Sequence, residues 1–166
     1  MATSTPELTI VQLNLYRFIN DRFEYLVFKR VAEDSEDQIW QPISETLRDG
    51  EEVEDALPRI AASHAGIDKL EHMSNSTYSY DWYSHGESGR DMVFAAQLPN
   101  NTPILPDLDR YITFEWLPRN AAIARIKWSG SKEAIRQLQE HLEQAKDMHA
   151  ESHETDVPSD SEPIFL

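Results

Sequence analysis

Four carboxylate side chains stand close together in the first half of the chain, at Glu45, Glu51, Glu52 and Glu54. Carboxylate oxygens are ligands that Mg²⁺ and Mn²⁺ prefer, and such a cation can activate water for attack on a phosphoanhydride. One interpretation is a metal site at Glu45 and Glu51, with Glu51 and Glu52 as catalytic residues. The other is structural, because acidic side chains at the start of a helix are stabilised by its dipole.

Five further side chains are candidates for binding a phosphorylated ligand: Lys29, Arg30, Trp40, Arg59 and Tyr80. Lys29 and Arg30 end a predicted strand, where either cation can meet a phosphate. Tyr80 belongs to a run of alternating aromatic residues, which either stack on a base or pterin ring or pack in the core or at its rim. Arg59 is equally suited to a structural ion pair with Glu51 or Glu45.

The bulk composition restricts the kind of protein. A chain of 166 residues fits one domain, and it contains no cysteine, so disulfides and thiolate metal sites are excluded. Its formal net charge of −15 disfavours nucleic acid and anionic lipid as partners. No apolar run is long enough to cross a bilayer, and the N-terminus lacks the pattern of a secretory signal. We therefore expect a cytoplasmic protein.

The periodicity of apolar residues predicts the order strands, helix, strands, helix. Strands are expected at residues 8–18, 23–31, 38–44, 70–83, 92–98 and 112–117, and helices at 51–65, 118–126 and 132–146. Asn20-Asp21 predicts a hairpin turn, and Pro42 indicates a sheet edge or a bulge. Pro58 indicates a helix that starts late or is kinked, while Gly66 is expected to cap it. These elements predict an α/β or α+β sandwich.

One stretch resembles the box of the Nudix hydrolases, G-x5-E-x7-R-E-U-x-E-E-x-G-U, where U is aliphatic. With Gly66-Ile67 aligned on its end, Arg59 falls on the box arginine and Glu51 on its first glutamate, without a gap. The segment ITFEWLPRNAAIARIKWSGSKEAIRQL most resembles the dihydroneopterin triphosphate pyrophosphatase branch. The resemblance implies an α/β/α sandwich with a mixed sheet over residues 8–145. It leaves residues 1–7 as a flexible N-terminus and residues 146–166 as an acidic, disordered tail.

Several residues depart from the family's pattern. Ile60 replaces the glutamate that follows the arginine, while Ser63 and His64 replace the paired glutamates. Glu45 stands where the box has its opening glycine, and Arg110-Tyr111 stands where some relatives have Glu-His. Isoleucine cannot bind Mg²⁺, and serine or neutral histidine is a poor substitute for a carboxylate.

Two functional hypotheses follow. The first is a Nudix-fold binding or interaction module without efficient hydrolase activity, whose ligand is a nucleotide or pterin phosphate and whose partner is another protein or a second copy. The second is an active pyrophosphohydrolase for nucleoside or pterin diphosphate-type substrates, which uses Mg²⁺ or Mn²⁺ held by the displaced carboxylates Glu45, Glu51 and Glu52.

Overall fold

The computed structural model of the chain describes residues 8–33, 35–70, 72–73, 78–84 and 86–156. The strands are β1 (Leu8–Ile19), β2 (Arg22–Val31), β3 (Gln38–Gln41), β4 (Ile43–Thr46), β5 (His72–Met73), β6 (Tyr78–Ser84), β7 (Glu87–Gln97) and β8 (Thr113–Pro118). The helices are α1 (Val53–Ala65), α2 (Arg119–Arg125) and α3 (Ser129–Asp156). None of the helices within the described ranges is long and apolar enough to cross a membrane.

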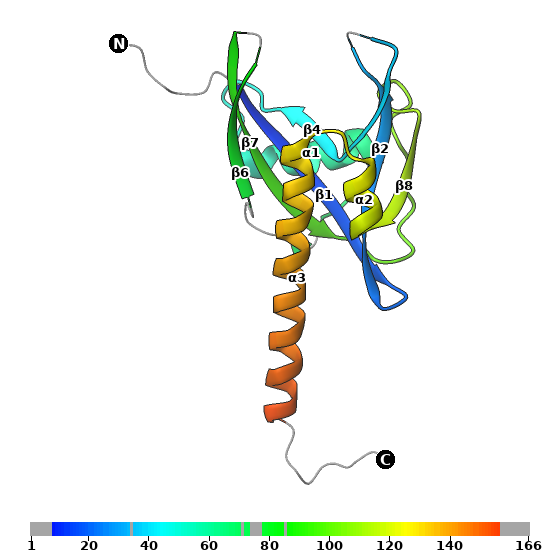
Figure 1. Cartoon of the computed structure of the whole chain (residues 1–166), viewed down its shortest axis with the longest axis vertical. Helices are drawn as coiled ribbons and strands as arrows, with labels where there is room; N and C mark the ends of the chain where they lie inside the picture. Colours follow the sequence, from blue (N-terminus) through cyan, green and yellow to red (C-terminus); the bar gives the residue numbers. More distant parts are fainter. Residues whose placement is uncertain (1–7, 34, 71, 74–77, 85, 157–166) are drawn as a thin grey trace, which may run out of the picture.

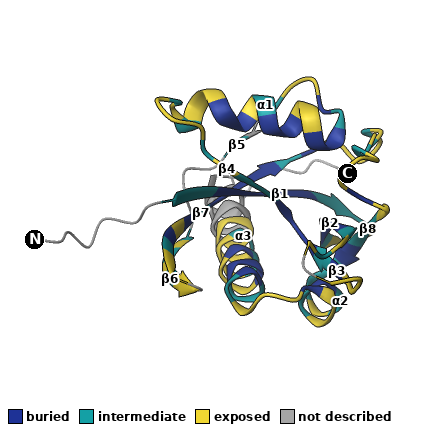
Figure 2. Cartoon of the chain, turned by 90° about the horizontal axis from the view of Figure 1, so that it is seen from above, coloured by how far each residue is buried: buried dark blue, intermediate teal, exposed yellow. Residues whose placement is uncertain are grey.

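The strands form one mixed sheet that lies between two helical layers, with α1 on one face and α2 and α3 on the other (Figure 2). Alternate residues of β1 serve the two faces: Leu13 and Leu15 pack in the cluster beneath α1, and Tyr16 packs in the cluster beneath α2 and α3. The expected α/β/α sandwich with a mixed sheet is confirmed.

A two-residue turn joins β1 to β2. Asn20 and Asp21 have φ angles of 55° and 63°, the left-handed pair that a type I′ hairpin requires and that Asn and Asp tolerate better than most residues. The turn places Ile19 opposite Arg22. The pairing of the two strands continues from there to Tyr16 opposite Tyr25. The predicted hairpin is therefore confirmed at its turn.

Beyond Tyr16 and Tyr25 the two arms of the hairpin separate, and the β3–β4 segment fills the gap. β3 pairs with the end of β2, from Phe28 to Val31, and β4 pairs with the beginning of β1, from Ile10 to Leu13. Pro42 lies between β3 and β4, where the chain leaves one arm for the other, and a proline there interrupts no continuous ladder. This splayed hairpin creates the hollow described below.

Helix α1 begins at Val53, two residues later than predicted, with Glu52 as its N-cap. Pro58 lies inside the helix, in its second turn, so only the carbonyl of Glu54 loses its helical donor. Gly66 ends the helix with φ of 71°, and its N–H and that of Ile67 bond back to Ala62 and Ala61. The predicted glycine cap is confirmed.

Three predicted boundaries were wrong. Helix α3 begins at Ser129 and continues to Asp156, ten residues beyond the predicted end, and it projects past the rest of the domain (Figure 1). Its acidic second half contains good helix formers and no proline before Pro158, so the helix has no reason to stop at Lys146. The expected tail from residue 146 is thus helical for its first part, and residues 157–166, like the N-terminal residues 1–7, lie outside the described ranges.

The other two errors concern the hairpin of β6 and β7. The strand predicted over 70–83 consists of β5 and β6, and β7 starts at Glu87 instead of Met92. Its polar start pairs along the whole of β6, with Gly89 opposite Trp82. The Trp82 ring lies so close over Gly89 that a Cβ there would be 2.3 Å from it. The Trp82 ring packs across the strands on Gly89, and this contact explains why β7 begins in a segment without alternating apolar residues.

Candidate ligand-binding site

A cavity of about 920 Å³ opens where the β1–β2 hairpin is splayed. Its walls come from β1, the end of β2, the β3–β4 segment, the end of α1, the β6–β7 hairpin, residues 109–111 before β8 and the first residues of α3. The cavity therefore reaches from the α1 layer to the α3 layer across one end of the sheet. We call it the splay cavity.

Arg59 of α1 holds two carboxylates beside this cavity. Its Nε donates to Glu51 Oε2 at 2.8 Å and its Nη2 to Glu51 Oε1 at 2.9 Å, while Nη1 donates to Glu45 Oε2. The three side chains are 14–23% exposed. Glu51 also accepts from the Arg48 N–H. Burial opposes ionisation of Glu45, but hydrogen bonds from Arg59 and His64 outweigh it and lower the pKa of this carboxyl.

His64, at the end of α1, contacts the Glu45 oxygen that Arg59 does not bind. Its Nε2 lies 2.7 Å from Glu45 Oε1, and its Nδ1 lies 2.7 Å from the Tyr111 hydroxyl. A carboxylate only accepts, so Nε2 carries the hydrogen and Tyr111 donates to Nδ1. Burial lowers the pKa of His64 despite the bond to Glu45, which keeps the ring neutral at pH 7. Both ring nitrogens are thereby used within the fold.

Two arginines face the same end of the cavity. Arg110 Nη1 lies 3.4 Å from Glu45 Oε1, and Arg110 Nε lies 3.4 Å from Asp107 Oδ2, so both contacts are long. Arg30 Nε donates to Gln41 Oε1 at 2.9 Å, and its Nη1 donates to the Val31 carbonyl at 3.2 Å. Both guanidiniums line the cavity.

The opposite end of the cavity is aromatic and polar. Asp91 is 7% exposed and accepts hydrogen bonds from Trp82 Nε1 at 2.7 Å, Gln12 Nε2 at 2.7 Å and the Tyr80 hydroxyl at 3.1 Å. Burial, followed by the charge of Asp91, raises the pKa of Tyr80 to about 12. Trp128 lines the mouth and is 46% exposed.

Glycine at position 130 allows α3 to begin against this wall. A Cβ at Gly130 would lie 2.4 Å from the Tyr80 ring, so the ring rests directly on the helix backbone. Ser131, in the next position, donates to Gln12 Oε1 at 3.2 Å. The aromatic end is thus tied to β1, β6, β7 and α3 at once, which fixes its shape before a ligand arrives.

The side chains around Glu45 do not form a binding site for a divalent cation. Arg59 and His64 already donate to the oxygens of Glu45, and Arg59 spans both oxygens of Glu51. Ile60 is fully buried in the apolar cluster beneath α1, and Ser63 is exposed, with its hydroxyl 3.4 Å from the Ile60 carbonyl. Across the described ranges, no three acidic or histidine side chains converge as metal ligands. The carboxylates beside the cavity are therefore partners of the chain's own cations.

The predicted residues fall into four groups. Arg30, Glu45 and Tyr80 line the splay cavity, and the Arg59–Glu51 pair supports it from behind. Glu52 is the exposed N-cap of α1.

Lys29 and Trp40 do not line this cavity. They are cross-strand partners packed toward α2, with the Lys29 Nζ 5.7 Å and the Arg125 guanidinium 5.1 Å from the Trp40 ring centre. Lys29 and Arg30 face opposite sides of the strand, and of the two only Arg30 lines the cavity. Ligand binding by Trp40 and Lys29 stays a prediction, and neither residue lines the splay cavity.

Gln12, Asp91, Tyr111 and Trp128 are among the lining residues that sequence reasoning missed. Gln12 carried a usable signal, because it is a polar residue between Val11 and Leu13 in an apolar strand, and it is 3% exposed. Asp91 had no such signal, since it lies in a polar segment just before the strand predicted from Met92.

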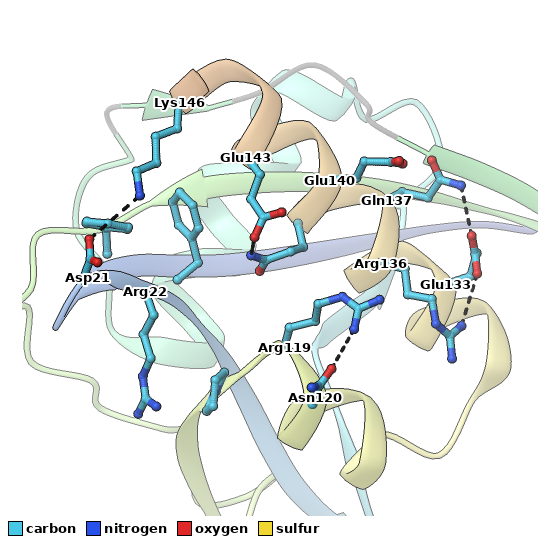
Figure 3. Close-up of a pocket in the computed structure, with 14 residues that line it drawn as sticks. Asp21, Arg22, Arg119, Asn120, Glu133, Arg136, Gln137, Glu140, Glu143 and Lys146 are labelled. Carbon is cyan, nitrogen blue, oxygen red and sulfur yellow. Dashed lines mark hydrogen bonds and ion pairs between the residues drawn. The ribbon is translucent and has the colours of Figure 1, made fainter. Parts of the chain in front are cut away.

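A second hollow, of about 710 Å³, lies between the hairpin turn, α2 and α3 (Figure 3). Its charged side chains mostly bond one another: Glu133 accepts from Arg136 and Gln137, Arg119 donates to Asn120, and Lys146 Nζ lies 3.9 Å from Asp21. Most of these groups are exposed, so the hollow lacks the buried polar groups of the splay cavity.

Comparison of the sequence with protein-family models and with curated proteins finds no match in either. Solved structures do match. A C. elegans Ap4A hydrolase in a binary complex has a TM-score of 0.69 at 17% identity, over 81% of this chain and 97% of the other. The E. coli dihydroneopterin triphosphate pyrophosphohydrolase has a TM-score of 0.66 at 20% identity, over 80% and 95%.

A third structure carries the family name. The NUDIX domain of Shewanella oneidensis NrtR, complexed with ADP ribose, has a TM-score of 0.67 at 12% identity, over 83% of this chain and 90% of the other. Each likeness extends over most of both chains, while the identities are too low to carry activity from one protein to another. Together with the sandwich and the splayed hairpin, they show that this chain has the Nudix fold.

Proposed function

We propose that this chain is a Nudix-fold binding protein that holds a nucleotide-type or pterin phosphate ligand in the splay cavity without hydrolysing it through Mg²⁺ or Mn²⁺. The observation that carries the proposal is the occupation of Glu45 and Glu51 by Arg59 and His64. A cation would have to displace the Arg59 guanidinium from both carboxylates, and it would leave this partly buried side chain without its partners, which is costly.

The cavity supports the ligand class. Its volume of about 920 Å³ lies within the range of small-molecule sites, which extends to roughly 1,000 Å³. Tyr80, Trp82 and Trp128 offer ring surfaces at one end, and Arg30 and Arg110 offer positive charge at the other. Two of the structural neighbours carry ligands or substrates of this class in their names, Ap4A and ADP ribose.

The test measures binding and turnover separately. The full chain is incubated with ADP-ribose, Ap4A or dihydroneopterin triphosphate in Mg²⁺ and in Mn²⁺, products are separated by chromatography, and binding is followed by calorimetry. We expect heat of binding from at least one of these compounds and no turnover above the buffer rate.

Metal-dependent turnover would overturn the proposal if it is lost in Glu51→Gln and kept in Glu140→Gln. Glu140 is an exposed glutamate of α3, outside the splay cavity, and the second substitution makes the same change of charge. That outcome would instead favour a pyrophosphohydrolase that uses displaced carboxylates. Calorimetric titration with Mn²⁺ alone gives an independent check, with no tight site expected.

A further inference from the structure

We infer that the splay cavity receives the phosphate group of its ligand directly on the guanidiniums of Arg30 and Arg110, with no metal ion between them. The inference rests on the proposed function and adds to it the place and the mode of phosphate binding. It starts from the replacement of a metal site by the chain's own side chains, because Arg59 already donates hydrogen bonds to both carboxylates that a cation would otherwise need.

Arg110 is available for a new partner. Its side chain is 41% exposed, and its contacts to Glu45 and Asp107 are both 3.4 Å, beyond the usual range of a charge-assisted hydrogen bond. Glu45 also accepts hydrogen bonds from Arg59 and His64, so both of its oxygens keep a partner when Arg110 turns to a ligand. A phosphate can therefore take Arg110 without leaving a buried carboxylate unpaired.

Arg30 is more firmly positioned and still has a donor to offer. Its bonds to Gln41 and to the Val31 carbonyl use Nε and Nη1. Among the described residues, Nη2 has no hydrogen-bond partner. Gln41 is buried and neutral, so it orients the guanidinium without neutralising its charge.

The two arginines line the same cavity from neighbouring segments. The Ile112 N–H donates to the Lys29 carbonyl at 2.7 Å, which holds the segment that carries Arg110 beside the end of β2 that carries Arg30. The positive charges of both arginines also oppose the rise that burial causes in the pKa of Tyr111, which lies next to Arg110.

Glu33 and Asp109 also line the cavity, both are exposed, and they match the two arginines in number of charges. Phosphate binding is therefore expected to depend on hydrogen bonds from the two guanidiniums and not on a net positive charge of the cavity.

Inorganic pyrophosphate in EDTA tests the inference without depending on a nucleoside. We expect the arginine Nε–H signals of Arg30 and Arg110 to shift on titration, as observed by ¹⁵N NMR of the full chain, and EDTA to leave the affinity unchanged. The double variant Arg30→Ala with Arg110→Ala should bind pyrophosphate at least about tenfold more weakly. Arg136→Ala is the matched control, because its side chain is 43% exposed and lies on α3 outside the cavity.

The outcomes separate the two claims. Equal affinity in the double variant and the wild type, or binding that requires Mg²⁺, overturns direct phosphate binding while nucleotide binding can stand. Pyrophosphate binding on the two arginines without any nucleoside binding supports this inference and removes the ring-binding part of the proposed function. If the double variant unfolds, Arg110→Lys decides: it keeps the charge and loses the planar donor pair, so affinity should fall by a smaller factor.

Discussion

The guanidinium of Arg59 spans both carboxylate oxygens of Glu51, at 2.8 and 2.9 Å, although eight positions separate the two residues. Glu51 precedes the helix and Arg59 lies in its second turn, so the pair closes the loop before α1 against the helix itself. The same arginine binds Glu45 of β4, and a single side chain thus joins a strand, a loop and a helix beside the splay cavity.

Restoring a carboxylate at position 60 is expected to destabilise the fold. Ile60 is fully buried between α1 and the sheet, so Ile60→Glu places a charge among apolar side chains with no partner. The free energy of unfolding should fall by at least about 3 kcal/mol, as measured by urea denaturation. Ser63→Glu is the control on the exposed side of the same helix, where the change should stay within about 0.5 kcal/mol. Similar losses in both variants would contradict the orientation of α1.

Stability is expected to fall as the pH drops through the mid-range, because of His64. Burial holds its pKa in the folded state below the ordinary value of 6.5, so below that pH the unfolded chain takes up a proton that the folded chain does not. The free energy of unfolding should fall on acidification, by at most about 1.4 kcal/mol per pH unit from this residue. Glu45 adds a similar loss only at lower pH, as the pH falls below 4.5 toward its lowered pKa.

Denaturation series from pH 7.5 downward, run on the wild type and on His64→Gln, measure this contribution. Glutamine keeps a donor for Glu45 but does not titrate. The variant should lose the part of the slope that begins near pH 6.5. An unchanged slope would show that His64 takes up its proton equally in the folded and unfolded chains.

Local chemistry made much of this fold predictable. Asn20 and Asp21 have short polar side chains that tolerate positive φ, and they form the turn that was expected there. Gly66 has no side chain, adopts positive φ and forms the expected helix cap. The seven-residue spacing between Glu51 and Arg59 also survived as a direct contact. In each of these cases the signal is contained in a few neighbouring residues.

The lining of the cavity was harder to predict because it depends on distant pairings. Gln12 meets Asp91 across 79 positions, and His64 meets Tyr111 across 47. Lys29 and Arg30 were predicted together as phosphate-binding residues, although successive residues of a strand face opposite sides. Only the splay of the hairpin decides where the cavity opens, and it is lined by Arg30 and not by Lys29.

Removal of one hydroxyl at Tyr111 is expected to leave His64 Nδ1 without its donor. Tyr111→Phe keeps the ring against Phe28 and should lower the free energy of unfolding by about 1–3 kcal/mol, the usual cost of a buried unpaired polar atom. Tyr83→Phe is the control, since that side chain is largely exposed and should change stability by less than about 0.5 kcal/mol. In the wild type, long-range ¹⁵N NMR should show the hydrogen of His64 on Nε2. A hydrogen on Nδ1 would contradict the donor assignment.

Two tryptophans should separate ligand binding from stability. Trp128 lines the mouth of the splay cavity and is nearly half exposed, so Trp128→Ala should leave stability within about 0.5 kcal/mol. It should weaken ADP-ribose binding about fivefold or more, by loss of a stacking surface. The Trp40 side chain packs in the cluster beneath α2, with Lys29 and Arg125 over its ring, so Trp40→Ala should cost about 2–4 kcal/mol of stability and leave the affinity of the folded protein unchanged. Calorimetry with ADP-ribose, combined with urea denaturation of both variants, checks the pair. The reverse pattern, with affinity lost at Trp40 and kept at Trp128, would place the ligand on the α2 side of the sheet and not in the splay cavity.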